Sequence, residues 1–232
     1  MQANMIVAAM VLLAGILPMA VAADENINLY PDWGHEKDVL DPANITMLEV
    51  YYAFNISGTD WDSLAEDELY DIVGILKQYQ EYDVLVNYLI LRDGTVICLA
   101  ENDSLVWHAK GYNNNSLGVR FVALNATIAA RLSEQEGRKI LPGPNDRQYE
   151  ALGRLVAELK DGAYPNIVEV VGYDELKAAQ NVTVPDSEID WQKANRHLER
   201  RGLEIRHFFR QTSSLIFKDF LFKFCVALEA ML

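Results

Sequence analysis

Hydrophobic and polar positions alternate along the chain with periods that predict strands and helices in turn. β-Branched and aromatic content predicts strands at 44–55, 84–91, 95–100, 117–124 and 167–171. Apolar positions spaced three and four residues apart predict helices at 63–82, 147–160 and 189–201. This mixture predicts an α/β fold, with a central mixed β-sheet of about five strands and helices packed on it.

Local turn signals refine this pattern. Ser63 and Glu66 form a capping box at the start of the first helix, and Asp93-Gly94 predicts a tight hairpin between two strands. The stretch VWHAKGYNNNSLGV, from Val106 to Val119, combines turn-forming glycine and asparagines with the apolar start of a strand, which predicts a loop feeding a core strand. We expect residues 173–187 to form an irregular loop.

Both ends of the chain differ from this central region. Residues 1–22 contain an apolar run followed by Ala20-Val21-Ala22, the small-x-small pattern of a signal peptide cleavage site, which predicts a secreted or extracellular protein. A retained N-terminal anchor is the alternative, because no Lys or Arg precedes the run. Residues 23–43 indicate an N-terminal arm, 44–201 the main domain, and 202–232 an apolar helical tail. The tail is expected to dock on the domain itself, on a second subunit or other protein partner, or on a membrane surface.

Composition narrows the partners. The chain has 34 acidic and 20 basic residues, a formal charge of −14, which argues against nucleic acid and anionic lipid as partners. Cys98 and Cys225 allow one disulfide or two free thiols. Six Asn-x-Ser/Thr sequons favour N-glycosylation at an extracellular surface, although asparagines also fill turns. The candidate sites are Asn44, Asn55, Asn102, Asn114, Asn125 and Asn181.

The central stretch resembles a known family. It contains Arg92-Asp93-Gly94 after an apolar strand, then Trp107-His108-Ala109 and Asn113-x-Asn115-Ser116-Leu117-Gly118-Val119. These motifs are similar to those of type 2 zinc N-acetylmuramoyl-L-alanine amidases and peptidoglycan recognition proteins. The resemblance covers about residues 44–201. It implies a ligand groove walled by Asn87, Trp107, His108, Lys110, Asn113, Asn115 and Ser116. A structural loop in which His108 is packed is the alternative interpretation.

The resemblance also implies positions for a zinc site. Such amidases hold zinc with two histidines and a cysteine or aspartate and leave one position open for water. Here Tyr51, Tyr173 and Val184 occupy the three ligand positions, and Val86 occupies that of a catalytic tyrosine. Phenol is a poor zinc ligand at neutral pH because its pKa is about 10. We therefore expect no metal and no cofactor, with zinc confined to active relatives; a shifted alignment would make Asp186 a ligand.

Other chemistry is weakly indicated. His35, His197 and His207 have no metal-ligand spacing, and no nucleophile elbow or phosphate loop is present. The acidic residues Glu101, Asp103, Asp174 and Glu175 form either a carboxylate pair or a solvated rim. The sequence thus predicts an exported pseudo-amidase that binds a cell-wall glycopeptide or other surface glycan. The alternatives are an active amidase and a structural surface glycoprotein, and zinc content separates the enzyme from the other two.

Overall fold

A computed structural model describes residues 26–56, 64–184 and 188–199 of the 232-residue chain. The main sheet contains six strands in the order β1-β5-β4-β7-β3-β8. Their bounds are β1 Ile27–Asn28, β3 Met47–Ala53, β4 Tyr88–Ile90, β5 Val96–Cys98, β7 Ser116–Val122 and β8 Glu169–Gly172. The helices are α2 Glu66–Leu69, α3 Ile72–Glu81, α4 Ala126–Glu136, α5 Asp146–Asp161, α6 Tyr173–Ala179 and α7 Trp191–Glu199. The predicted α/β class is confirmed.

The sheet is mixed, as the sequence predicts. β4 pairs antiparallel with β5 through the hairpin at Asp93-Gly94, where Gly94 has a φ of +90°. β4, β7, β3 and β8 run parallel to one another, with Tyr51 of β3 beside Arg120 of β7 and Val50 beside Gly172. Parallel strands place their carboxyl ends at one edge, where ligand sites of α/β sheets commonly lie. Tyr173 therefore begins α6 next to Tyr51.

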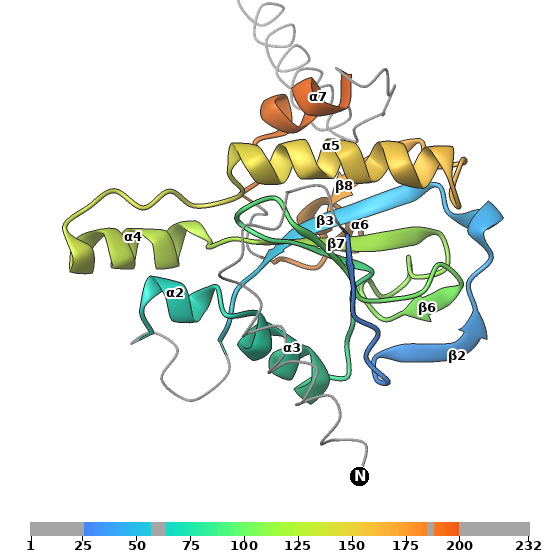
Figure 1. The fold of residues 1–232 in the computed structure, drawn as a ribbon, viewed down its shortest axis with the longest axis horizontal. Helices are drawn as coiled ribbons and strands as arrows, with labels where there is room; N and C mark the ends of the chain where they lie inside the picture. Colours follow the sequence, from blue (N-terminus) through green and yellow to red (C-terminus); the bar gives the residue numbers. More distant parts are fainter. Residues whose placement is uncertain (1–25, 57–63, 185–187, 200–232) are drawn as a thin grey trace, which may run out of the picture.

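The two faces of the sheet differ in what covers them (Figure 1). One face is covered by α5, with α7 packed on the far side of that helix, while α2 and α3 lie on the opposite side of the sheet. Alternation assigns the β3 residues Leu48, Val50 and Tyr52 to the α5 face, where they pack with Phe121 and helix residues such as Leu152. Glu49 and Tyr51 consequently point to the other face.

The N-terminal segment contributes strands, and it raises the sheet from the expected five strands to six. β1 adds to the edge of the sheet, parallel to β5. β2, His35–Val39, pairs antiparallel with β6, Ser104–Val106, in a separate two-stranded sheet. Both β1 and β2 fall within residues 23–43. Hydrophobic periodicity could not predict β1, because a strand of only two residues shows no repeating pattern.

The helices differ from the expectations in three ways. The single helix expected at 63–82 is two helices, because the Asp71 carboxylate accepts hydrogen bonds from the Val73 and Gly74 N–H groups and starts α3. Residues 173–179 form α6 rather than irregular loop. Helix α4 is additional, capped by Asn125 and ended by Gly137 in a left-handed conformation with φ +64°.

Several predictions fall outside the described residues. These are the signal peptide at 1–22, the positions of Ser63, Asp186 and Cys225, and the tail at 202–232. The capping box expected at Ser63 and Glu66 is wrong, because α2 begins at Glu66 with Ala65 as its N-cap, and the Glu68 carboxylate accepts a hydrogen bond from the Ala65 N–H. Within the described part of the chain, no helix has the length and apolar character needed to cross a membrane. Cys98 is buried, and its thiol donates to the carbonyl of Ala100.

Candidate functional site

Two aromatic rings meet where the resemblance places two zinc ligands. The ring centroids of Tyr51 and Tyr173 lie 5.2 Å apart with a tilt of 56°. Tyr51 also stacks on Tyr52 at 4.3 Å, and Tyr52 stacks on Phe54 at 5.8 Å. Burial raises the pKa of the Tyr51 phenol above its usual range, and a hydrogen bond with Tyr52 adds to the shift. Tyr51, Tyr173 and Phe54 remain half-buried, so this aromatic cluster reaches the surface.

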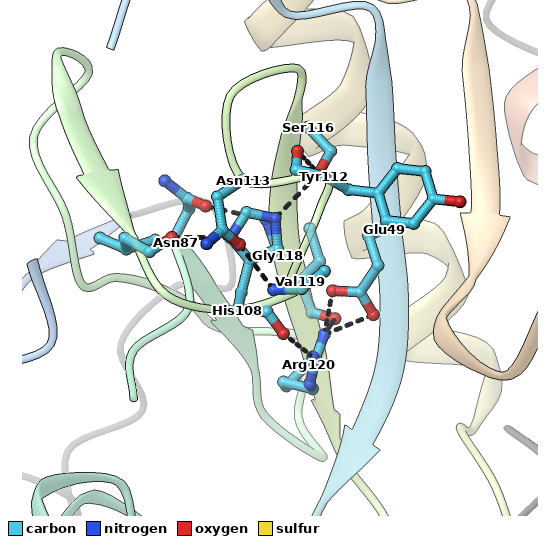
Figure 2. Close-up of polar contacts among 11 residues, drawn as sticks. Glu49, Asn87, His108, Tyr112, Asn113, Ser116, Gly118, Val119 and Arg120 are labelled. Carbon is cyan, nitrogen blue, oxygen red and sulfur yellow. Dashed lines mark hydrogen bonds and ion pairs between the residues drawn. The ribbon is translucent and has the colours of Figure 1, made fainter. Parts of the chain in front are cut away.

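A buried ion pair lies beside the aromatic cluster. Arg120 Nη1 is 2.7 Å and 2.8 Å from the two carboxylate oxygens of Glu49, joining neighbouring strands β7 and β3 (Figure 2). Glu49 is fully buried, and the Arg120 side chain is 9 % exposed. The guanidinium carbon lies 5.7 Å from the Tyr51 ring centroid and 5.4 Å from that of Tyr173, within cation–π range.

The pKa values of the pair reflect burial. Desolvation raises the pKa of Glu49, and the attraction of Arg120 opposes this shift. Desolvation is the largest single effect on Arg120 and lowers its pKa, but the attraction of Glu49 and Tyr79 and the hydrogen bond with Glu49 together raise the pKa above its ordinary value. The geometry favours the charged pair, since a guanidinium this close to both carboxylate oxygens forms charge-assisted hydrogen bonds.

Charged residues at the start of α6 border the cluster. Asp174 and Glu175 follow Tyr173, and the Glu175 carboxylate accepts a hydrogen bond from the Gly172 N–H. Burial raises the pKa of Glu175, with Asp174 adding to the shift. Lys177 Nζ lies 5.1 Å from the Tyr173 ring centroid. The half-buried rim is therefore aromatic with charges of both signs.

His108 is packed against the sheet. It is 9 % exposed, and the Gly118 backbone lies so close that a Cβ there would be 2.7 Å from His108 Cβ and Cγ. Nδ1 lies 3.2 Å from the Val106 carbonyl. Nε2 lies 2.9 Å from the hydroxyl of Ser116, which is labelled in Figure 2. Burial, then the charge of Arg120, lowers the pKa of His108 to about 3. The ring is therefore neutral and structural, and both of its nitrogens lie within hydrogen-bond distance of a polar group of the chain.

The remaining predicted groove residues divide into two groups. Asn87, Asn113 and Ser116 bond to the backbone: Asn87 Oδ1 accepts from the Gly118 N–H at 2.8 Å, Asn113 Oδ1 accepts from the Ala109 N–H, and Ser116 donates to the Tyr112 carbonyl. Trp107, at 43 % exposed, and Lys110 face solvent. Asn115 is half-buried, and its main chain bonds Thr46 and Tyr112. Only Trp107 and Lys110 of this set are exposed side chains.

Val86 and Val184 carry no polar atom on their side chains. Val86 is buried among residues of the α3 face, and Val184 is half-buried after α6. Among the described residues, no group of three or more His, Cys, Asp or Glu side chains is arranged to hold a metal ion. Sequence reasoning missed both members of the ion pair, Glu49 and Arg120, because a contact between residues 71 positions apart leaves no local signal.

The six sequons differ in exposure. Asn44, Asn102, Asn114 and Asn181 are exposed, and Asn125 is half-buried at the start of α4, where it caps the Ile128 N–H. Asn55 is 8 % exposed; it donates to the Glu68 carbonyl and is packed so tightly on Gly74 that a Cβ there would lie 2.2 Å from its Cγ. The Asn55 amide is thus inaccessible in the folded chain.

Comparison with known proteins decides the family. The sequence profile described as N-acetylmuramoyl-L-alanine amidase matches residues 57–201, more than half of the chain. The chain belongs to the N-acetylmuramoyl-L-alanine amidase family. A search of curated proteins finds no match.

Solved structures similar to this amidase-family chain have low sequence identity. A bumblebee peptidoglycan recognition protein, PGRP-SA, is 18 % identical with a TM-score of 0.49, over 74 % of this chain and 94 % of that one. A selenomethionine derivative of AmpD is 20 % identical with a TM-score of 0.48, over 75 % and 95 %. The amidase LysC from Clostridium intestinale is 14 % identical with a TM-score of 0.43, over 68 % and 99 %.

The residues at the centre of this site do not fit the zinc ion that the resemblance implies. Zinc needs imidazole, thiolate or carboxylate donors. Here the expected ligand positions hold the phenols of Tyr51 and Tyr173, and the Tyr51 pKa is raised. Beside them lies a guanidinium that is already paired with the buried Glu49 carboxylate. These residues therefore support no zinc-dependent step.

Proposed function

We propose that this chain is an exported, non-catalytic member of the amidase family that binds a cell-wall glycopeptide or another surface glycan. The observation that carries the proposal is the contact of Tyr51 with Tyr173, both beside Arg120, where the resemblance calls for metal ligands. Hydrolysis by the family's chemistry needs a metal-activated water. Binding needs only a surface that complements the ligand.

The aromatic cluster supports binding. Tyrosine combines an apolar ring face with a polar hydroxyl, which suits the mixed apolar and hydroxylated surface of a sugar. Asp174, Glu175 and Lys177 border this cluster with hydrogen-bonding groups, as in sites that combine apolar area with a few polar groups. We propose Tyr51, Tyr173 and Phe54 as the ring surfaces that meet the ligand, with Trp107 and Lys110 as further contacts of the groove wall.

A sedimentation assay with insoluble peptidoglycan tests the proposal. The purified chain is expected to sediment with peptidoglycan, and Tyr173→Ala is expected to reduce the bound fraction by about tenfold, as for loss of an aromatic anchor. Tyr82→Ala is the matched control, because Tyr82 is 65 % exposed at the end of α3. Equal binding by both variants would show that the aromatic cluster is not part of the ligand site.

The same assay distinguishes the alternatives. Release of L-alanine peptides into the supernatant would indicate an active amidase. Absence of binding to peptidoglycan and to an array of surface glycans would favour the structural glycoprotein instead.

A further inference from the structure

The Arg120 guanidinium is surrounded as a bound cation would be. The Glu49 carboxylate lies on it at 2.7 Å and 2.8 Å, and Nη1 donates to the Val119 carbonyl at 3.1 Å. The faces of Tyr51 and Tyr173 supply π density. All of these neighbours present negative charge or electron density to one buried positive group.

We infer that the Arg120 guanidinium is a built-in cation that takes the place of a metal ion at the centre of this fold. It connects β3 through Glu49 and Tyr51, its own strand β7, and the start of α6 through Tyr173. This inference does not depend on whether the chain binds a glycopeptide.

The same arrangement excludes a divalent metal ion. A second positive charge within a few ångströms of a buried guanidinium is repelled, and the buried Glu49 carboxylate is already paired with that guanidinium. Restoring histidines at the two tyrosine positions is therefore insufficient to create a metal site. Arg120 must also be removed, which frees Glu49 as a ligand.

The structure places that latent donor set on neighbouring elements. Glu49 and Tyr51 are two positions apart on β3 and share a face of the sheet, and the Tyr173 ring touches that of Tyr51. Two imidazoles and one carboxylate form a donor set that binds zinc with an open position in catalytic sites. Tyr51→His, Tyr173→His and Arg120→Met together supply that set from described residues alone.

Zinc titration by calorimetry tests the exclusion. The variant with all three changes is compared with the matched variant that carries Tyr51→His and Tyr173→His but keeps Arg120. Removal of the guanidinium is expected to raise zinc affinity by at least about 100-fold, because arginine repels the zinc ion and the neutral methionine does not. If the two variants bind zinc with the same affinity, the inference is overturned. This holds both when the two bind zinc strongly and when neither binds it detectably.

Chemical rescue tests the same inference without metal. Arg120→Ala removes a group equivalent to ethylguanidine, so about 20 mM ethylguanidinium is expected to bind the emptied site and to recover at least half of the lost Tm. Arg154→Ala is the matched control, because it removes a half-buried guanidinium that donates to the Gly94 carbonyl. Absence of rescue, or equal rescue of both variants, contradicts the inference.

A charge-free variant keeps the test decisive if Arg120→Ala folds poorly. Glu49→Gln combined with Arg120→Met leaves no buried charge at the centre, so it is expected to melt at a higher temperature than Arg120→Ala and to be unaffected by ethylguanidinium. The reverse order of melting temperatures would show that Arg120 does not act as the counter-charge of Glu49.

Discussion

The two faces of the central sheet are built from alternate residues of the same strands, yet they have different physical chemistry. On the α5 face, Leu48, Val50 and Phe121 pack with apolar residues of the helix. On the opposite face, Glu49 and Arg120 form an ion pair next to Tyr51 and His108. That opposite face also carries an apolar cluster under α3, which includes Leu89, Ile97 and Val122. We call it the polar face because it holds the buried ion pair.

The largest expected effect is on the apolar face. Phe121→Ala removes a fully buried ring that packs against Tyr149 with centroids 5.7 Å apart. Loss of its burial and the resulting cavity are expected to lower the free energy of unfolding by about 4 kcal/mol. Urea denaturation measures this change. A loss below about 1 kcal/mol would show that the α5 face is not the main source of stability.

The next effect concerns the buried ion pair on the polar face. Arg120→Met leaves the Glu49 carboxylate buried without its partner and is expected to lower the free energy of unfolding by about 3 kcal/mol. Adding Glu49→Leu is expected to recover at least half of that loss, because no charge remains to be desolvated. A double-mutant cycle in urea measures the coupling. If the two changes have additive effects on the free energy of unfolding, Glu49 and Arg120 are not coupled, and the ion pair does not distinguish the two faces.

A smaller effect concerns pH. The pKa of His108 is about 3 in the folded chain and about 6.5 in its ordinary state, so the unfolded chain binds the extra proton as pH falls below 6.5. The stability conferred by the neutral ring is present above pH 6.5 and is lost progressively toward pH 3. Between pH 7.5 and 4.5, wild type is expected to lose about 2 kcal/mol more than His108→Gln. Both proteins keep the Glu49–Arg120 pair, so its contribution cancels in this difference. Identical losses of stability in both proteins would mean that His108 has the same pKa in the folded and unfolded chain.

The smallest expected effect on stability is at the surface sequons. When the chain passes through a eukaryotic secretory pathway, glycopeptide mass spectrometry is expected to find glycan on exposed Asn44, Asn102 and Asn181, and none on buried Asn55. Asn102→Gln is expected to remove one glycan and change the free energy of unfolding by less than about 0.5 kcal/mol. Glycan on Asn55 would contradict its packing against Gly74.

Sequence patterns predicted the two faces unequally. Periodicity located β3, β7 and α5, and Asp93-Gly94 located the hairpin, because these signals are local. Helix α4 was missed although Asn125 and Gly137 provided its capping signals, and α6 has only seven residues, too few to show a period. The ion pair joins positions 71 residues apart, and only the parallel register of β3 and β7 brings them together. On the polar face, the resemblance therefore pointed to Tyr51 and Tyr173 as site residues, whereas no sequence signal pointed to Arg120.

The most direct measurement of the central claim is a crystal structure of the wild-type chain grown with zinc, using anomalous scattering at the zinc edge. The account predicts a guanidinium bonded to Glu49 between the rings of Tyr51 and Tyr173, with no anomalous peak among these four residues. A zinc peak at coordination distance of about 2.1 Å from Tyr51, Tyr173 or Glu49, with Arg120 displaced, would contradict it and would favour an active amidase.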